Sequence, residues 1–343
     1  MRLAHALVMT FSLLACAATP GPASASEDVL DAVLARWDHD GNPDLNAVVV
    51  MRDGQVVAER YFNGETSETL HDVRSAGKSV TALLATIAVD RGLISALSDP
   101  VQTYWPEATG SAIGDVRLSE VLTMRSGLAA FDGDTPSPGD EVFLDEAADP
   151  LAFTLAVPRA NAPGTLYRYN SLTAYVAGLV IEKAVGQSLS RFAEEALFTP
   201  LDIDAWRWDA DRGGHTKGQG NLWLNARDFA RIGEVVRAGG LYQGQRIVSE
   251  AGLAAMLEPR VPIPPEADDP YADAYGYFWY AKTYRIGDGT VAVRFASGNG
   301  GNKIYVIPER DLVIAVTSSA YGRGYGQRRS EAILKAILAE DHP

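Results

Sequence analysis

Cysteine is almost absent from this sequence: Cys16 is the single one among 343 residues. A disulfide within the chain is therefore excluded, and the fold must be stable through its core alone. Histidine is also scarce, and no group of histidines has the spacing typical of a zinc site. We expect neither a metal centre nor a cofactor. The histidines are His5, His39, His71, His215 and His342.

Positive charge is in deficit, with 30 lysines and arginines against 44 aspartates and glutamates and a net charge of -14. Such a chain is a poor candidate for binding nucleic acid or anionic lipid through its whole surface, because both carry the same charge. The hydrophobic fraction of 47% is ordinary for a globular protein with a sizeable core. We expect no nucleic-acid partner.

The N-terminus carries an apolar run over Leu3–Thr19, followed by the small-x-small pattern of a cleavage site at Ala23–Ala25. The run is too short, and too closely followed by prolines, for a spanning helix. We interpret residues 1–25 as a signal peptide, which predicts an exported protein, periplasmic or secreted. Leu13–Cys16 also resembles a bacterial lipobox, in which a lipidated Cys16 becomes the mature N-terminus. Both forms of processing stay open, and membrane anchoring is expected only through Cys16.

Strand-like segments lie near both ends of the chain, and helical patterns fill the middle. Ala47–Met51 and Gln55–Phe62 flank Asp53-Gly54, a strong signal for an antiparallel hairpin. Further strands are expected at Thr290–Ala296, Lys303–Ile307 and Leu312–Thr317. Helices are expected at Ser75–Arg91, Leu118–Met124, Leu172–Val185, Ala226–Ala238 and Gln327–Ala339.

This order of elements predicts an α/β (α+β) fold, in which an antiparallel sheet flanked by helices carries an inserted helical lobe. We place the sheet lobe at about 26–95 and 275–343 and the helical lobe at about 96–274, within one domain over 26–343. No repeat or low-complexity linker separates the lobes. They should therefore share an interface, where ligand pockets commonly lie.

The stretch His71–Val80 allows two interpretations. It contains Gly77–Ser79, the closing triplet of a nucleotide-binding P-loop, but Asp72 stands where that loop requires its first glycine. A carboxylate there would repel the phosphates, and a hairpin is not the parallel strand that feeds a P-loop, so nucleotide binding is excluded. Gly298–Gly301 fails as a dinucleotide-binding motif, because a strand rather than a helix follows it.

The second interpretation rests on Ser75 and Lys78, three residues apart. At the start of a helix this spacing places both side chains on one face, so the ammonium can approach the hydroxyl. Burial lowers the pKa of a lysine, which can then accept or relay a proton. The positive potential at the helix N-terminus favours an alkoxide and an oxyanion. The pair indicates a serine hydrolase, although four residues alone are a weak motif.

Further stretches strengthen this interpretation. Tyr169 lies in Pro163–Ser171, just before an apolar helix, and the glycine-rich Ser297–Gly301 lies between two expected strands. Serine–lysine, tyrosine and a glycine-rich strand, in this order, resemble the serine β-lactamase and penicillin-binding-protein superfamily. The class C β-lactamase-related branch, with its family VIII esterases, D-aminopeptidases and 6-aminohexanoate-dimer hydrolases, is the most similar. Segments that also resemble this branch are Val121–Leu128, Ala196–Leu201 and Leu222–Gly233.

The resemblance, which runs over nearly all the mature chain, implies a β-lactamase/transpeptidase-like fold and a role for each motif. Ser75 would be the acylated nucleophile, Lys78 its activating partner and Tyr169 a second proton carrier, with Tyr167 as a nearby competitor. Whether the lysine or the tyrosine is the acylation base stays open. The implied oxyanion hole uses the backbone N–H groups of Ser75 and Asn299. The implied substrate-binding positions are Ser171, Ser297, Gly298 and Asn299.

The sequence departs from this branch at two positions. Ser171 stands where the second motif usually has asparagine, and Ala296 where the third usually has lysine or histidine. That cation helps hold the carboxylate of a β-lactam or a D-Ala-D-Ala peptide, and its loss removes about 1.5–3 kcal/mol of charge-assisted binding. Esters or amides without this carboxylate are therefore favoured, unless Lys303 or Arg294 supplies the cation from nearby.

We expect an exported serine hydrolase that cleaves a small-molecule ester, amide or peptide through an acyl-enzyme on Ser75. Two alternatives stay open: a D,D-peptidase or weak β-lactamase acting on cell-wall-like substrates, and a non-catalytic binding module of the penicillin-recognising type. The joint presence of Ser75, Lys78 and Tyr169 argues against the second alternative. Asp132–Asp140 and Pro262–Ala274 are the loops expected to shape the pocket between the lobes.

Overall fold

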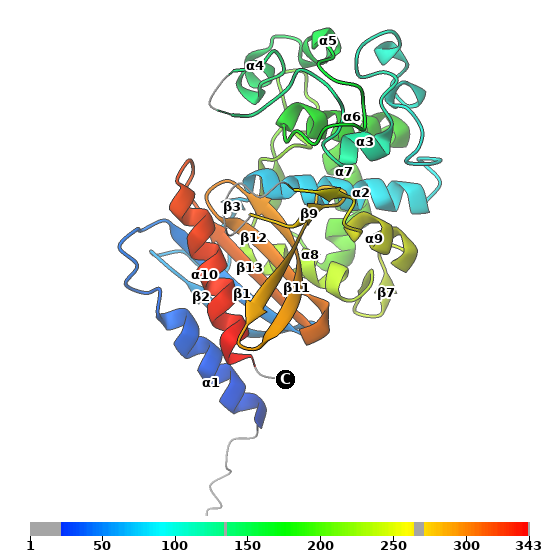
Figure 1. The fold of residues 1–343 in the computed structure, drawn as a ribbon. Helices are drawn as coiled ribbons and strands as arrows, with labels where there is room; N and C mark the ends of the chain where they lie inside the picture. The colour runs from blue at the N-terminus through cyan, green and yellow to red at the C-terminus, as the bar shows by residue number, and fades with distance from the viewer. Residues whose placement is uncertain (1–21, 134–135, 264–270, 342–343) are drawn as a thin grey trace, which may run out of the picture.

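Figure 1 shows the computed structural model of the chain, which describes residues 22–133, 136–263 and 271–341. Its centre is an antiparallel sheet that has eight strands over these residues, in the order β2-β1-β13-β12-β11-β10-β9-β8. The sheet joins the two ends of the chain, because β1 (Leu45–Arg52) pairs with β13 (Leu312–Ser318). The other strands are β2 (Gln55–Tyr61), β8 (Val261–Pro262), β9 (Ala274–Tyr275), β10 (Tyr280–Ile286), β11 (Gly289–Gly298) and β12 (Asn302–Ile307).

The N-terminal hairpin forms where the sequence predicts it. Asp53 and Gly54 have φ angles of 46° and 76°, the left-handed conformation that both central residues of a type I′ hairpin turn require. Every residue of β1 from Leu45 to Met51 is buried, so the strand does not alternate between core and solvent. This burial on both faces means that the sheet is covered on both sides.

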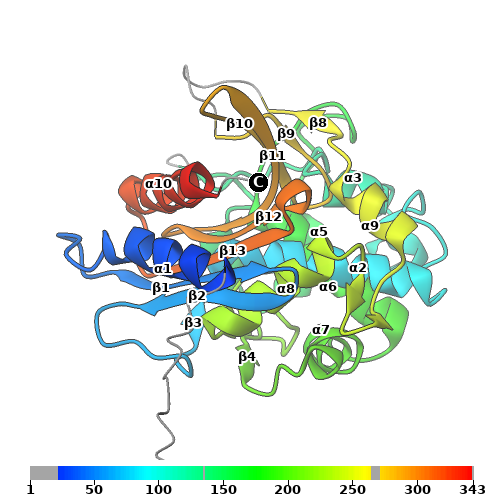
Figure 2. The same cartoon turned by 90° about the horizontal axis from the view of Figure 1, so that it is seen from below.

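Helices form the two covers, as Figure 2 shows. On one side α8 (Ala226–Arg237) packs against β1, β12 and β13. Gly233 permits this close approach, because a Cβ there would lie 2.5 Å from Cγ2 of Ile304. On the other side α1 (Pro22–Ala35) packs against β2 and α10 (Gly324–Glu340), and α10 also contacts β12 and β13.

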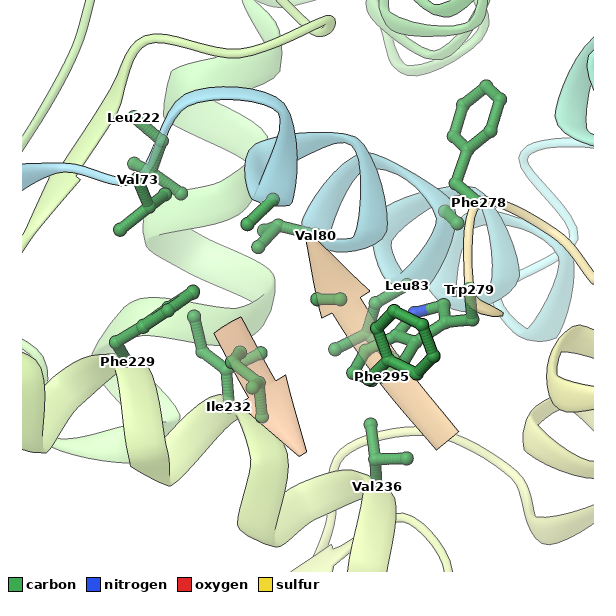
Figure 3. Packing of buried hydrophobic residues seen from close by; sticks show 14 of the residues in the cluster. Val73, Val80, Leu83, Leu222, Phe229, Ile232, Val236, Phe278, Trp279 and Phe295 are labelled. Carbon is green, nitrogen blue, oxygen red and sulfur yellow. The ribbon is translucent and has the colours of Figure 1, made fainter. Parts of the chain in front are cut away.

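Helix α2 (Gly77–Asp90) runs between the sheet and the helical lobe (Figure 1). All its residues over 77–88 are buried. It packs against β11 and α9 (Glu250–Leu257) on the sheet side and against α6 (Ser171–Val185) on the other. An apolar layer formed by α2, α8 and β11 fixes the helix on the sheet, and Figure 3 shows in it Val80, Leu83, Ile232, Val236 and Phe295.

The helical lobe completes the fold with short elements: α3 (Leu118–Leu122), α4 (Glu141–Glu146), α5 (Pro150–Ala156) and α7 (Leu189–Ala193). A small sheet of β3 (His71–Asp72), β5 (Leu222–Leu224) and β4 (Trp206–Trp208) lies beside the start of α2. The predicted hairpin, C-terminal strands and helices are all found, with ends within three residues of those expected. Four elements within the range expected for the helical lobe, about 96–274, belong to the sheet lobe instead: α8, α9, β8 and β9. The helical lobe is therefore smaller than that range.

The predicted signal peptide lies largely outside the described residues, as does Cys16. None of the helices that the structure describes is long and apolar enough to cross a membrane. Within the same described ranges, no group of three or more histidine, cysteine, aspartate or glutamate side chains is placed to hold a metal ion.

Candidate active site

Ser75 lies in a tight turn between β3 and α2. Arg74 has a φ of 51°, a left-handed conformation that is uncommon for a non-glycine residue. Its backbone N–H donates to Oδ1 of Asp72 at 2.8 Å, which helps hold the turn. The chain continues as a 3-10 helix, Arg74–Ala76, and then directly as α2. Ser75 therefore stands at the N-terminus of a long helix, where the potential favours an anion.

The end of β11 packs directly against this turn. A Cβ on Gly298 would lie 2.1 Å from the carbonyl oxygen of Val73 and 3.1 Å from the backbone nitrogen of Ala76. Only glycine permits this approach, which gives the glycine of the third motif a structural reason. The approach also brings Ser297, near the end of β11, and Asn299, which follows the strand, into the same cavity wall as Ser75.

Lys78 lies behind Ser75 and is 1% exposed. Its Nζ donates to Oγ of Ser75 at 3.0 Å, to Oγ of Ser171 at 3.1 Å and to the backbone carbonyl of Gln219 at 2.7 Å. These three bonds occupy all the N–H groups of an ammonium. Burial lowers the pKa of Lys78, and nearby carboxylates oppose this effect.

Of the two candidate tyrosines, Tyr169 is the one that lines the cavity. The centre of its ring lies 5.1 Å from Nζ of Lys78. Burial raises the pKa of its phenol, and a hydrogen bond with Ser75 opposes the rise. Tyr167, the competing tyrosine, packs edge to face against Tyr275 with 5.4 Å between the ring centroids. The structure therefore places Tyr169 rather than Tyr167 beside the serine.

A cavity of about 330 Å³ lies in front of Ser75. It brings together the predicted site residues Ser75, Tyr169, Ser171, Ser297, Gly298 and Asn299. Both loops expected to shape the pocket contribute a side chain to its wall, Asp132 and Tyr271, although residues 134–135 and 264–270 of these loops lie outside the described ones. The placement of the predicted residues is a finding, whereas their catalytic roles stay predictions.

A second buried lysine stands behind another part of the wall. Lys303 is 2% exposed, and its Nζ donates to Oγ of Ser297 at 2.8 Å and to the hydroxyl of Tyr271 at 2.6 Å. These two hydroxyls also hydrogen-bond each other. Burial lowers the pKa of Lys303 well below its usual value. The lysine side chain that Ala296 lacks is therefore supplied one strand away by Lys303, but the hydroxyls of Ser297 and Tyr271 stand between its Nζ and the cavity.

Arg294, the other candidate for this cation, does not reach the site. Its Nε donates to the backbone carbonyl of Leu257 at 3.2 Å, and it lines a different groove, together with Glu258 and Glu309. Of the two possible substitutes that the sequence offers, Lys303 is the one placed at Ser297.

Two carboxylates in the wall were not predicted as site residues. Oδ2 of Asp132 accepts a hydrogen bond from the backbone N–H of Ser171 at 2.5 Å, at the first turn of α6. Glu141, the first residue of α4, lines the cavity nearby. Burial raises the pKa of both carboxyls, and the charge of Lys78 opposes this. Other unpredicted wall residues are Arg74, Gln219, Gly220, Asn221, Tyr280 and Gln327.

With this geometry established, the comparison with known proteins decides the family. The chain matches the beta-lactamase family over residues 45–338, which is most of its length. It belongs to this family. The resemblance and the β-lactamase-like fold that the sequence predicts are thereby confirmed.

Curated relatives of this beta-lactamase family member are longer than the part they share with it. The 6-aminohexanoate-dimer hydrolase of Paenarthrobacter ureafaciens is 27% identical over 263 residues, covering 69% of this chain and 64% of that protein. The beta-lactamase of Escherichia coli K12 is 31% identical over 139 residues, covering 40% of this chain and 35% of that protein. The chain therefore matches less than two thirds of the length of either.

Solved structures show the same fold over nearly the whole chain. A class C beta lactamase from Rhodobacter sphaeroides superposes with a TM-score of 0.69 at 18% identity, covering 91% of this chain and 100% of that one. A family VIII carboxylesterase gives a TM-score of 0.69 at 18% identity, covering 91% and 97%. One architecture therefore carries a lactamase and an esterase, so the substrate must be argued from the cavity.

Proposed function

We propose that this beta-lactamase family member is an exported serine hydrolase that cleaves an ester or amide through an acyl-enzyme on Ser75. The observation that carries the proposal is the 3.0 Å contact between Nζ of Lys78 and Oγ of Ser75 at the wall of the cavity. A nucleophile within hydrogen-bond reach of a buried base is the arrangement that covalent catalysis needs. Its relatives include a 6-aminohexanoate-dimer hydrolase and an N-acetylmuramyl-L-alanine amidase, and a family VIII carboxylesterase has the same fold, which supports the reaction class.

The proposed reaction has two steps. Oγ of Ser75 attacks the substrate carbonyl and gives up its proton, and the leaving alcohol or amine takes a proton as the first acyl bond breaks. A water molecule then attacks the acyl-enzyme and restores Ser75, releasing the acid. The backbone N–H groups of Ser75 and Asn299 are proposed to stabilise the oxyanion in both steps, since both residues line the same cavity.

Lys78 is the better candidate for the group that accepts the proton of Ser75. Burial lowers the pKa of Lys78, which favours the neutral amine, whereas burial raises the pKa of Tyr169, which disfavours the phenolate. A neutral amine has two N–H groups for Ser171 and the carbonyl of Gln219, and its lone pair then faces Ser75. Tyr169 is left to pass a proton between Ser75 and the leaving group.

The test is the initial rate on a short-chain nitrophenyl ester for the wild type and for Ser75→Ala. We expect hydrolysis by the wild type and its loss in the variant. A rate that the substitution leaves unchanged would show that another group is the nucleophile. No rate in either protein would support the non-catalytic binding module instead.

A second candidate function is favoured by Lys303. A cation beside Ser297 could serve a substrate carboxylate, as the cation of the third motif does in the resembling enzymes, and this would suit a D,D-peptidase or weak β-lactamase. However, Lys303 does not line the cavity, so a carboxylate meets hydroxyls before it meets the ammonium. Comparing rates on a chromogenic β-lactam and on the ester decides between the two, and a preference for the lactam would overturn the ester or amide proposal.

Export is proposed from the apolar run and the small-x-small pattern at residues 1–25. Mass spectrometry of the mature protein would show whether its N-terminus follows Ala25 or is a lipidated Cys16. An intact Met1 in the mature protein would contradict export by either route.

A further inference from the structure

Arg74 is the one cationic residue that lines the cavity among the residues that the structure describes. Its side chain is 38% exposed, so a ligand can reach it. Lys78 and Lys303, by contrast, are only 1% and 2% exposed and stand behind the wall. Arg74 directly precedes Ser75 in the chain, so an anion held by its side chain lies within the length of a small substrate from a carbonyl at Ser75.

The guanidinium of Arg74 is held in place by its neighbours. Its Nε lies 3.2 Å from Oδ2 of Asp72, and its Cζ lies 4.1 Å from the centre of the Tyr321 ring. The hydroxyl of Tyr321 donates to the backbone carbonyl of Asp72 at 3.1 Å, which joins the two partners. These contacts engage Nε and one face of the guanidinium, whereas most of its N–H donors are on Nη1 and Nη2. A group fixed in this way loses little entropy when it binds a ligand.

Asp72 shares its negative charge among several donors. Its Oδ1 accepts a hydrogen bond from the backbone N–H of Arg74 at 2.8 Å, and its Oδ2 accepts one from Nδ2 of Asn221 at 3.0 Å. Both oxygens are therefore engaged by neutral donors as well as by the guanidinium. Within the described ranges Asp72 is the one carboxylate paired with Arg74. The guanidinium can accordingly pair with a second anion.

The other side chains of the wall leave room for that anion. Asn221, Asn299 and Gln327 line the cavity with uncharged amides. The carboxyls of the wall, Asp132 and Glu141, come from the helical lobe instead, and the first is bonded to the start of α6. An anion is therefore favoured on the side of the cavity where Arg74 stands.

The backbone of Arg74 indicates that its side chain has a use. The φ of 51° is a conformation that glycine or asparagine adopts more readily than arginine. The turn that carries Ser75 does not by itself call for an arginine. Backbone conformations of this kind are found most often at active and binding sites, where the side chain justifies their cost.

We propose that Arg74 binds a carboxylate of the substrate. The proposal rests on the proposed function and narrows it: the substrate is an ester or amide that carries a carboxylate a few bonds from the reacting carbonyl. The carboxylate oxygens accept hydrogen bonds from Nη1 and Nη2, in the side-by-side geometry that a planar guanidinium favours. This place differs from the third motif, where Ala296 has no charge and Lys303 lies behind the hydroxyls of Ser297 and Tyr271.

Binding to the Ser75→Ala protein tests the subsite without turnover. The probes are succinamic, glutaramic and adipamic acid, which place the carboxylate at increasing distances from an amide carbonyl. Each acid is compared with its own diamide, which has nearly the same shape and no charge. By calorimetry we expect at least one acid to bind at least about tenfold more tightly than its diamide, as a charge-assisted pair implies. No binding of any acid, or equal binding of every acid and its diamide, would overturn the proposal.

Substitutions in the same background locate the carboxylate. Arg74→Gln should reduce the preference for the acid to within about threefold, because the charge and the fork of donors are removed. Arg74→Lys should keep part of the preference, since the charge remains and the fork is lost. The control is Lys303→Gln, which removes the rival cation and should leave the preference unchanged. Circular dichroism checks the fold of each variant.

The rival explanations give different results. A preference that survives Arg74→Gln and disappears in Lys303→Gln would place the carboxylate at Ser297 and Tyr271 and overturn the proposal. Equal weakening of acid and diamide in Arg74→Gln, with their ratio kept, would overturn it too, because the arginine would then only hold the turn.

The same data separate the subsite from the proposed function. A preference for the acid that depends on Arg74, in a protein whose wild type hydrolyses no nitrophenyl ester, would keep the subsite and remove the proposed function. Ester hydrolysis that depends on Ser75, together with no preference for any acid, would keep the function and remove the subsite.

Discussion

Two buried lysines stand behind the same cavity, and each hydrogen-bonds a serine in its wall beside a tyrosine. Lys78 lies 3.0 Å from Oγ of Ser75, and Lys303 lies 2.8 Å from Oγ of Ser297. The first lysine lies 5.1 Å from the ring centre of Tyr169, and the second lies 4.4 Å from that of Tyr271. Burial lowers the pKa of both lysines. By side chains alone, either cluster could be the catalytic one.

The backbone makes the difference between the two clusters. Ser75 stands at the N-terminus of α2, in a turn that Gly298 of β11 approaches closely. Ser297 lies inside β11, paired in register with Lys303 of β12. A helix N-terminus stabilises an alkoxide and an oxyanion, and a strand interior does not. We therefore expect catalysis at the first cluster and substrate binding at the second, although both contain a serine, a lysine and a tyrosine.

The largest expected effect separates the two serines. Ser75→Ala should reduce kcat for a nitrophenyl ester by at least about 10³-fold, because the acyl-enzyme cannot form. Ser297→Ala should reduce kcat/KM by about tenfold or less, as the loss of one hydrogen bond implies. Steady-state kinetics on the same ester measure both, and equal losses would mean that the clusters do not differ in role.

The next largest difference is expected between substitutions of the two lysines, one of which should change kcat and the other KM. Lys78→Met should reduce kcat by about 10²–10⁴-fold, the range for general base catalysis. Lys303→Met should mainly raise KM, because it releases the hydroxyls of Ser297 and Tyr271 but leaves Ser75 intact. In the wild type kcat should increase with pH through a pKa below the usual 10.5 of lysine, as Lys78 loses its proton. If Lys303→Met removes this limb of the pH profile, the roles are reversed.

A smaller effect is expected from Tyr271→Phe, which removes one hydroxyl and keeps the ring against Tyr280 and Phe295. The expected change is a threefold to tenfold increase in KM with kcat little changed, about the value of one hydrogen bond. Tyr169→Phe is the variant for comparison, and we expect this substitution to lower kcat rather than to raise KM. A larger kcat loss for Tyr271→Phe would place that tyrosine in proton transfer.

The smallest expected effect concerns stability. Because burial lowers the pKa of Lys303 well below 10.5, the unfolded chain binds more protons than the folded one between the lowered value and 10.5. Wild-type stability therefore gains a contribution as pH rises through this window, and Lys303→Met lacks it. Denaturant unfolding at pH 7 and pH 10 should show the variant at least as stable at pH 7, with a relative advantage of about 1–2 kcal/mol that shrinks at pH 10. An advantage that grows with pH would contradict the lowered pKa.

Much of this site could be predicted from the sequence, because its residues sit on regular elements. Ser75 and Lys78 are one helical turn apart, and Ser297 directly follows the alternating run Thr290–Ala296, so their positions follow from short-range patterns. The hairpin followed in the same way from Asp53 and Gly54, whose turn type is encoded locally.

The remaining wall residues depend on distant parts of the chain. Lys303 faces Ser297 because of the register between β11 and β12, which the sequence of either strand does not contain. Tyr271 and Asp132 stand in loops without periodicity, so a loop could be named but not the side chain it contributes. Glu141 reaches the cavity through the path of the chain between α3 and α4. The packing of α8 against the sheet likewise depends on distant parts of the chain, so the sequence of α8 does not show it.

The most direct test of the difference between the two clusters is to label the protein with a fluorophosphonate, which reacts with activated serines, and to map the modified peptide by mass spectrometry. The label is expected on Ser75 alone, with none on the peptide that contains Ser297, and Lys78→Met should abolish it while Lys303→Met should not. A label on Ser297, or labelling of Ser75 that persists without Lys78, would contradict the assignment of the first cluster to catalysis and the second to binding.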